Sequence, residues 1–316
     1  MKILITGCCG FIGFNLSYYL LKNGFKIVGI DNIDNYYDIK IKYDRLKILS
    51  KNKRFKFRKI NISNNEKVKK IFDQNKFDFV INLAAQAGVR YSIKNPRKYM
   101  LNNSVGFFNI LENSRLKLIK NVIFASSSSV YGDKKKFPVK ENDELSPKNF
   151  YGLTKKHNEE MAEIYSQLYN MNICGLRFFT VYGEWGRPDM FMLKYINSFK
   201  KFSLFNKGEH FRDFTYIKDV NSIIHRLINK KLKGFNILNI CSNNPIKITK
   251  VIKMINNLLD KKKIKIKKLG LQRADVIKTH GCNDRMKKIT KFKTFTPVEK
   301  GVESLVNWYK KKIFNK

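Results

Sequence analysis

Residues 2–13 read KILITGCCGFIG, and this stretch decides the fold. It opens with a short, mostly apolar run typical of a buried strand, and apolar side chains then recur at helical spacing as far as Leu20. The three glycines therefore fall on the turn between a strand and a helix. Such a turn lets backbone N–H groups approach a pyrophosphate at the helix N-terminus. The motif predicts a dinucleotide-binding loop made of Gly7, Gly10, Phe11, Ile12 and Gly13.

The next predicted strand ends in an acidic residue. Lys26–Ile30 has the composition of a strand, and Asp31 follows it directly. A carboxylate at this point accepts hydrogen bonds from an adenosine ribose and repels a 2′-phosphate, so Asp31 favours NAD over NADP as the cofactor. A glycine turn without a ligand and a polar strand end are each common alone. Their combination in one strand–turn–helix–strand unit favours the cofactor interpretation.

Strands and helices continue to alternate through the first half of the chain. Further predicted strands are Phe55–Ile60, Asp78–Leu83, Asn121–Ser126 and Asn172–Arg177, and predicted helical segments include Glu66–Gln74, much of Pro96–Leu118, and Tyr151–Tyr169. This alternation predicts an α/β fold with a doubly wound, Rossmann-like parallel sheet. We expect residues 1–177 to form the NAD-binding domain and residues 178–316 a smaller C-terminal substrate-binding region, with some elements crossing between them.

The chain is strongly basic, with 64 Lys+Arg against 25 Asp+Glu and a formal net charge of +39. A charge of this size raises the possibility of a nucleic-acid partner. The lysines are spread along the whole chain, however, and no aromatic RNA-binding signature or DNA-reading module interrupts the α/β pattern. We therefore expect no specific nucleic-acid partner.

Several further classes of protein are disfavoured by composition. The chain has no run of 18 apolar residues, so we expect no membrane span. Its five cysteines show no CxxC spacing, which favours reduced thiols and a cytoplasmic location. Its four histidines lack metal-binding spacing, so we expect no metal.

Two runs in the middle of the chain carry proton-transfer chemistry. Residues 126–132 read SSSSVYG and residues 151–155 read YGLTK. Tyr151 and Lys155 lie four residues apart and would share one face of a helix. A serine hydroxyl, a phenol and an ammonium beside a nicotinamide are what the oxidation of an alcohol requires. A tyrosine and a lysine at this spacing often occur by chance, but the serine run and the glycine loop together favour a catalytic helix.

These motifs resemble the extended short-chain dehydrogenase/reductases, and within them the nucleotide-sugar epimerases that act on UDP-glucuronate. The stretches that carry the resemblance are TGCCGFIG, DNIDNYYD, NLAAQAGVRYSIKNP, SSSSVYG, YGLTKK, LRFFTVYGEWGRPDM and RDFTYIKDV. The resemblance implies an NAD-dependent isomerase that inverts C4 of a UDP-sugar through a 4-keto intermediate, and most closely the conversion of UDP-glucuronate to UDP-galacturonate. It also implies a homodimer.

The resemblance also assigns roles to individual residues. It implies that Tyr151 takes the proton of the sugar O4, that Ser127 holds O4, and that Lys155 binds the nicotinamide ribose and lowers the pKa of Tyr151. The implied cofactor contacts beyond the glycine loop are Asp31 and Asn32 at the adenosine half, Asn61 and Ile62 near adenine, Leu83, Ala84 and Ala85 at the nicotinamide side, and Asn103 in support.

The implied substrate contacts involve different parts of the UDP-sugar. Ser127 and Arg90 belong to them, Arg212 would meet the UDP phosphates, and Arg273 would either add a phosphate contact or only reshape its loop. Ser128 and Thr180 would bind a C6 carboxylate, with Arg187 paired to it. An arginine fork suits a carboxylate, but a salt bridge between loop and domain is an equally good interpretation of Arg187.

Related activities differ at a few positions. A 4,6-dehydratase needs an Asp-Glu pair where this chain has Ser128 and Ser129, and a UDP-glucuronate decarboxylase usually carries Glu at the second of these positions. UDP-galactose 4-epimerases commonly carry Asn where this chain has Thr180. Another UDP-hexose 4-epimerase and a non-catalytic NAD-binding regulator remain the alternatives.

Overall fold

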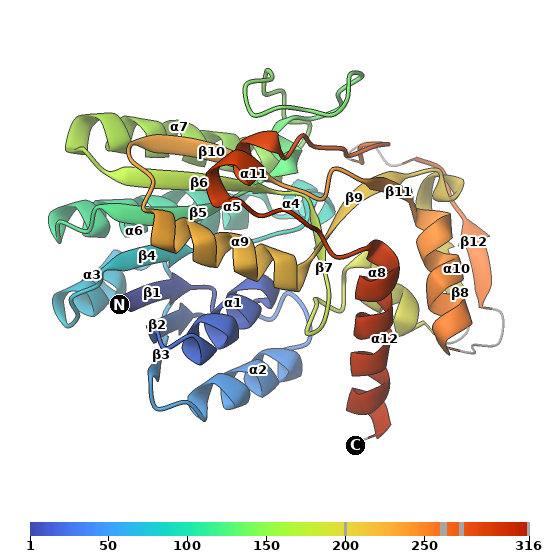
Figure 1. The fold of residues 1–316 in the computed structure, drawn as a ribbon, viewed down its shortest axis with the longest axis horizontal. Coiled ribbons are helices and arrows are strands. Elements are labelled where there is room, and N and C mark those ends of the chain that lie inside the picture. Colours follow the sequence, from blue (N-terminus) through green and yellow to red (C-terminus); the bar gives the residue numbers. More distant parts are fainter. Residues whose placement is uncertain (199–200, 260–263, 272–274, 315–316) are drawn as a thin grey trace.

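The computed structural model describes residues 1–198, 201–259, 264–271 and 275–314. Its centre is a seven-stranded sheet with the strand order β10-β6-β5-β4-β1-β2-β3, paired parallel throughout (Figure 1). The strands are β1 (Lys2–Thr6), β2 (Lys26–Asp31), β3 (Phe55–Lys59), β4 (Phe79–Asn82), β5 (Asn121–Ser127), β6 (Asn172–Phe178) and β10 (Phe235–Ile240). The strand order reverses between β1 and β4, and a reversal of this kind opens a ligand crevice at the carboxyl ends of the strands.

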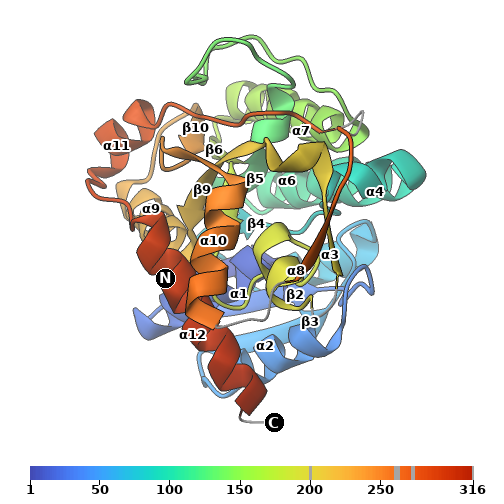
Figure 2. The same cartoon turned by 90° about the vertical axis from the view of Figure 1, so that its right-hand side faces the viewer.

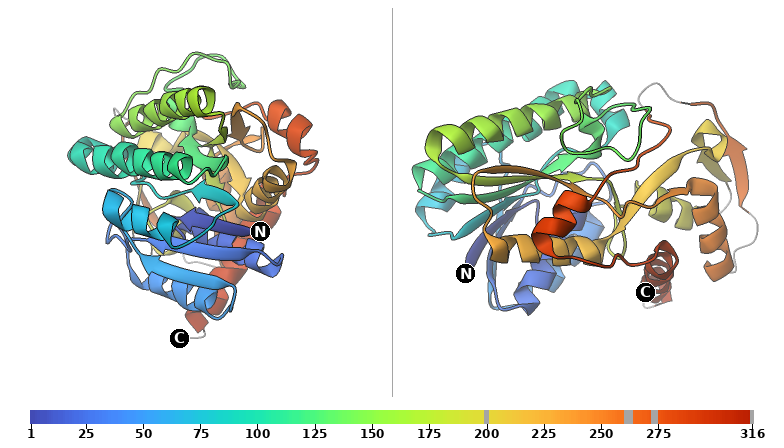
Figure 3. Two further views of the ribbon diagram at one scale, coloured as in Figure 1. Left: turned by 90° about the vertical axis from the view of Figure 1, so that its left-hand side faces the viewer. Right: turned by 45° about the horizontal axis from the view of Figure 1, so that its top comes forward.

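Helices cover both faces of this sheet (Figure 3). Ile3 and Ile5 face one hydrophobic core and Leu4 faces the other, so successive residues of β1 are buried on opposite sides. The first core packs against α1 (Phe11–Lys22), α2 (Lys40–Ser50), α9 (Ile217–Lys230) and α11 (Asp284–Thr290). The second packs against α3 (Asn65–Asp73), α6 (Gly106–Leu116) and α7 (Phe150–Tyr169). The predicted doubly wound α/β class is confirmed.

One long predicted helix is subdivided. The segment expected over Pro96–Leu118 consists of α5 (Pro96–Tyr99), a π-helical stretch η1 (Met100–Val105) and α6. A short helix that the sequence did not predict, α4 (Val89–Lys94), precedes it. The other predicted elements of the first half agree with the structure to within a residue or two at their ends.

The second half of the chain forms a smaller layer beside the carboxyl edge of the sheet (Figure 2). It contains a three-stranded sheet of β7 (Thr180–Tyr182), β9 (Phe211–Tyr216) and β11 (Pro245–Lys247), and a pair made of β8 (Lys201–Leu204) and β12 (Lys265–Lys268). Its remaining elements are α8 (Phe191–Ile196), η3 (Phe205–Gly208), α10 (Ile248–Leu259) and α12 (Val298–Phe314).

Between these elements the chain returns to the large sheet, where β10 pairs with β6. The boundary at residue 177 therefore stays a prediction. No helix within the described residues is both long enough and apolar enough to cross a membrane.

Candidate active site

A cavity of about 270 Å³, called the main cavity because most of the predicted site residues line it, opens at the carboxyl ends of the central strands. The glycine loop follows β1, Asp31 ends β2, Leu83 follows β4 and Ser127 ends β5. The predicted residues that line this cavity are Gly7, Gly10, Phe11, Ile12, Gly13, Asp31, Asn32, Asn61, Ile62, Leu83, Ala84, Ala85, Ser127, Tyr151, Lys155 and Arg187. Residues far apart in the sequence thus meet around one space.

The glycine loop has the shape that a phosphate-binding turn requires. Gly7 has a φ of +70°, and a Cβ added there would lie 2.8 Å from the backbone nitrogen of Ala84. A Cβ on Gly13 would lie 2.1 Å from the carbonyl oxygen of Gly7. Helix α1 begins at Phe11 without a side-chain cap and without an acidic residue in its first turn. Its N-terminal N–H groups and positive dipole end therefore suit an anionic pyrophosphate.

Asp31 is buried at the rim of this loop. Its carboxylate accepts hydrogen bonds from the backbone N–H of Cys9 at 3.0 Å and of Ile33 at 2.8 Å. Burial raises the pKa of Asp31, and these backbone bonds oppose that rise. Each carboxylate oxygen has a further lone pair, so the group can also accept hydrogen bonds from ribose hydroxyls. The glycine loop and Asp31 together fit a dinucleotide without a 2′-phosphate.

Helix α7 and strand β5 bring the proton-transfer groups together. The side chain of Asn149 caps α7 by accepting a hydrogen bond from the N–H of Gly152 at 2.8 Å, so Tyr151 lies in the first turn. Lys155 follows one turn later, and its Nζ lies 5.9 Å from the centroid of the Tyr151 ring. This Nζ also donates to the carbonyl oxygen of Ala125 at 2.8 Å, which fixes the lysine against β5.

The charge states of these groups are set by burial. Burial lowers the pKa of Lys155 to about 8, although the negative charge of Glu159 opposes this shift. Lys155 therefore remains mainly an ammonium at neutral pH. Burial raises the pKa of Tyr151, while a hydrogen bond with Ser127 and the positive charge of Arg187 act to lower it. We expected a lowered Tyr151 pKa, but the protein alone raises it. Desolvation of the phenolate outweighs the nearby positive charge.

Three other predicted residues lie outside the described lining of the main cavity. Asn103 is buried behind it, where its Oδ1 accepts from the N–H of Gln86 at 2.7 Å and its Nδ2 donates to Thr154 at 3.1 Å. Ser128 begins the short 3₁₀ turn η2 (Ser128–Val130). Thr180 lines a smaller adjoining cavity of about 30 Å³, to which Arg187 also contributes.

Arg187 forms a salt bridge within its own loop and not one between loop and domain, and its contact with a C6 carboxylate stays a prediction. Its guanidinium binds the carboxylate of Asp189 through two contacts of 3.0 and 2.5 Å, so it forms a salt bridge within its own loop. The same side chain lines both cavities and lies 5.4 Å from the ring of Tyr36 and 5.7 Å from that of Tyr37. Arg187 is therefore a cation held at the cavity wall by an acid and two aromatic rings.

Two other predicted arginines, Arg90 and Arg212, contact residues 275–277. Arg90 forms an ion pair with Asp275 at 2.6 Å. Arg212 donates to the carbonyl oxygens of Val276 at 2.8 Å and Ile277 at 3.0 Å, and burial lowers its pKa to about 10. Neither arginine is in the described lining of the main cavity. The predicted Arg273 lies outside the described residues.

The prediction from sequence missed part of the cavity wall. Tyr36, Tyr37, Gln86 and Met190 line it and were assigned no role. The two tyrosines belong to the DNIDNYYD stretch, so the motif itself was the signal that could have identified them. Gln86 and Met190 likewise belong to the quoted NLAAQAGVRYSIKNP and LRFFTVYGEWGRPDM stretches, so the same kind of signal was present for them.

Comparison with known proteins finds relatives along the whole chain. Residues 3–241 match the family described as the NAD dependent epimerase/dehydratase family. Protein CapI of Staphylococcus aureus is 42% identical over 98% of this chain and 98% of its own length. UDP-glucuronate 4-epimerase of Thermodesulfobacterium geofontis is 38% identical over 98% of this chain and 96% of its own length. The crystal structure of UDP-glucuronic acid 4-epimerase from Bacillus cereus, in complex with UDP-glucuronic acid and NAD, has a TM-score of 0.91 and 30% identity and covers 99% of this chain and 100% of that chain.

Proposed function

The chain belongs to the NAD dependent epimerase/dehydratase family, and we propose that it inverts C4 of UDP-glucuronate to give UDP-galacturonate through a 4-keto intermediate. The observation that carries this proposal is the meeting of Ser127, Tyr151 and Lys155 in the cavity that also contains the glycine loop. Proton transfer and dinucleotide binding therefore share one space. The relatives and solved structures named as UDP-glucuronate 4-epimerases support the choice of reaction.

NAD would be held along the cavity by the loop after β1, by Asp31 and by the side chains that follow β3 and β4. When bound, it supplies a hydride acceptor and donor for C4 of the sugar. The residues proposed for its adenosine half are Asn32, Asn61 and Ile62, those for its nicotinamide half are Leu83, Ala84, Ala85, Tyr151 and Lys155, and Asn103 supports the loop after β4 through Gln86.

Tyr151 is the proposed proton carrier. Its phenolate oxygen takes the proton of the O4 hydroxyl as C4 is oxidised and returns it when C4 is reduced on the opposite face. Ser127 donates to and orients O4. The ammonium of Lys155, held by the carbonyl of Ala125, stabilises the phenolate by its charge. The reaction has no net redox change, so the cofactor stays bound between turnovers.

The proposed sugar specificity depends on a positive charge at the cavity wall. Arg187 is half-buried against Tyr36 and Tyr37 and is oriented by Asp189, which holds its guanidinium at the cavity wall, where we propose that it meets a C6 carboxylate. Ser128 and Thr180 would add hydroxyl contacts. Arg90, Arg212 and Arg273 are proposed to bind the diphosphate, and the proximity of the first two to Asp275 supports this grouping.

The test is a panel of UDP-sugars incubated with the purified protein, followed by separation of the C4 epimers. UDP-glucuronate should be converted faster than UDP-glucose. Arg187→Ala should narrow this difference, because loss of a charged hydrogen bond in a buried site costs about 1.5–3 kcal/mol. Asp189→Asn, which removes the loop's ion pair but retains the guanidinium, should preserve the preference. Equal slowing of both sugars by Arg187→Ala would show that Arg187 serves its loop alone.

The proposal also covers the oligomeric state of the protein and its location in the cell. Apolar side chains are exposed on the outer faces of α6 and α7, namely Phe108, Leu116, Leu153, Ile164 and Leu168, and a face of this kind supports a symmetric homodimer. All five cysteines are free, which supports a cytoplasmic location. An activated uronic acid made there would serve as a sugar donor for polysaccharide synthesis.

A further inference from the structure

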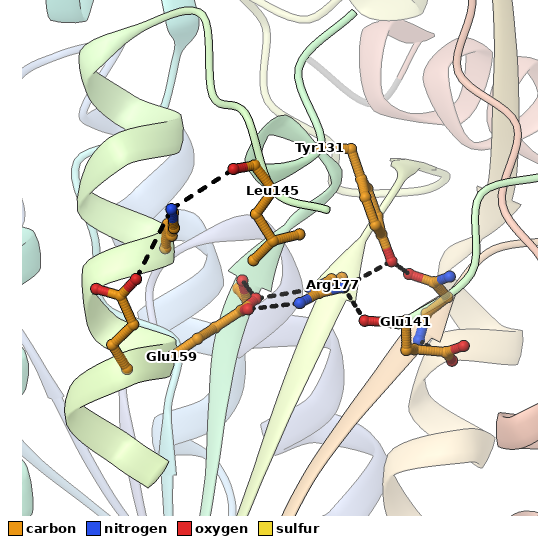
Figure 4. A network of polar contacts seen from close by, with 9 residues as sticks. Tyr131, Glu141, Leu145, Glu159 and Arg177 are labelled. Carbon is orange, nitrogen blue, oxygen red and sulfur yellow. Dashed lines mark hydrogen bonds and ion pairs between the residues drawn. The ribbon is translucent and has the colours of Figure 1, made fainter. Parts of the chain in front are cut away.

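A buried ion pair lies directly beneath the catalytic groups, and neither of its members is in the described lining of the cavity. Glu159 on α7 and Arg177 on β6 are both almost fully buried, with relative exposures of 4% and 3%. They are joined by two hydrogen bonds, from Nε at 2.9 Å and from Nη2 at 2.7 Å (Figure 4). A buried pair of this kind adds little net stability, because desolvation of both charges offsets their attraction. Stability alone therefore does not explain its place in the fold.

The pair contacts both ends of the turn that carries the catalytic serine. At one end, the hydroxyl of Ser126 donates to Glu159. At the other end, Arg177 donates from Nη1 to the phenol oxygen of Tyr131 at 2.8 Å (Figure 4). Ser127 lies between these two anchors. One ion pair thus fixes the short segment in which the position of the Ser127 hydroxyl is decided.

The same pair is connected to the other two catalytic residues through α7. Glu159 lies one turn after Lys155 and two turns after Tyr151, so all three share the buried face of the helix. The phenol of Tyr131 donates in turn to Asn239 on β10 at 2.7 Å. These contacts therefore connect α7, β5, β6 and β10 next to Ser127.

We propose that Glu159 and Arg177 are positioning residues for the epimerase reaction. Their hydrogen bonds with Ser126 and Tyr131 fix the chain on either side of Ser127 and thereby the position of its hydroxyl. This inference rests on the proposed function. Catalytic groups must be held close to their reactive geometry, and a misplacement of about 1 Å lowers a rate by about 10²-fold. The Ser127 hydroxyl contacts Ser129 at 3.1 and 3.2 Å and the phenol of Tyr151, while the hydrogen bonds of Ser126 and Tyr131 with the ion pair hold the chain on either side of it.

The test removes one anchor without leaving a buried charge unpaired. Tyr131→Phe deletes a single hydroxyl outside the described lining of the cavity, and Ser126→Ala deletes the other anchor. Tyr195→Phe is the matched control, because Tyr195 is equally buried and its hydroxyl also donates to an asparagine, Asn256, at 2.7 Å. For each variant, kcat, KM for UDP-glucuronate, bound NAD and the melting temperature are measured.

We expect Tyr131→Phe and Ser126→Ala to lower kcat by at least about 10-fold, toward the loss that a misplaced group causes. KM and bound NAD should stay unchanged, and Tyr195→Phe should keep the kcat of the unmodified protein. A kcat in both variants equal to that of Tyr195→Phe would overturn the proposal. If Tyr131→Phe does not fold, Ser126→Ala decides by the same criterion. Absence of epimerase activity in the unmodified protein would defeat the proposed function instead, so the two failures are distinguishable.

Discussion

At the scale of single residues, Tyr151 has the most direct proposed role, because it is the proposed proton carrier. Tyr151→Phe keeps the ring and its edge-on packing against Tyr99 but removes the proton acceptor. Because general-base catalysis contributes about 10²–10⁴-fold, epimerisation should fall by at least that range while UDP-sugar and NAD still bind. Rates of epimer formation and binding by calorimetry check this. A variant with a near-normal rate would mean that the base lies elsewhere.

Asp31 is the residue that we propose to select between the two dinucleotides. Its carboxylate lies at the end of β2 and would repel a 2′-phosphate, so the purified protein should contain NAD and discriminate against NADP. Asp31→Ala should relax this preference, since the repulsive charge is gone. Mass spectrometry of the nucleotide released by denaturation, and affinities for both dinucleotides, test the prediction. Recovery of NADP, or a lack of any affinity for NAD, would refute it.

Predicted site residues that belong to a local motif line the main cavity more often than those that come from segments far from these motifs in the sequence. The glycine loop, Asp31 and the Tyr151–Lys155 pair each follow a strand or share a helix face, and this spacing fixes their place in the cavity. Arg90 lies on α4 but pairs with Asp275, and Arg212 lies on β9, so the place of both side chains depends on how the smaller layer packs. Sequence spacing contains no information about that packing. It therefore could not show that these two arginines lie outside the described lining of the cavity.

At the scale of elements, hydrophobic patterning was sufficient for β1 to β6 and for α1, α3 and α7, but it did not predict β10, α9 or α10. It was not sufficient for the segment after Pro96, where a π-helical stretch joins two helices. A π-helix closes i→i+5 hydrogen bonds where an α-helix closes i→i+4, and over a stretch of 6 residues the apolar pattern does not distinguish the two. Asn103 and Ser104 are buried in this stretch, and the former reaches Gln86 beside the cavity.

The outer faces of α6 and α7 provide a prediction at the same scale. Leu168 is 68% exposed and Ile164 is 52% exposed on α7, and burial of such side chains in a second copy would be favourable. Ile164→Glu should therefore shift the protein from dimer to monomer in sedimentation analysis. Tyr43→Glu, at an exposed aromatic residue of α2, is the control and should leave the dimer intact. A monomeric unmodified protein would contradict the assignment.

At the scale of the whole molecule, the sheet order places the dinucleotide loop and the proton-transfer helix at the same edge. Because the carboxyl ends of parallel strands meet at one edge, the sequence was enough to predict that these motifs lie together. It was not enough to predict that the chain returns from the smaller layer to add β10 to the sheet. Residues near β10, including Asn239, thereby join the contacts beneath the site.

The central claim is that one site removes hydrogen from C4 of UDP-glucuronate and returns it to the opposite face. The direct measurement is turnover of UDP-glucuronate carrying deuterium at C4, with no added nucleotide and with the product analysed by mass spectrometry and NMR. We predict UDP-galacturonate that retains deuterium at C4. Exchange of the label with solvent, release of a ketone product, or a product unchanged at C4 would contradict the claim.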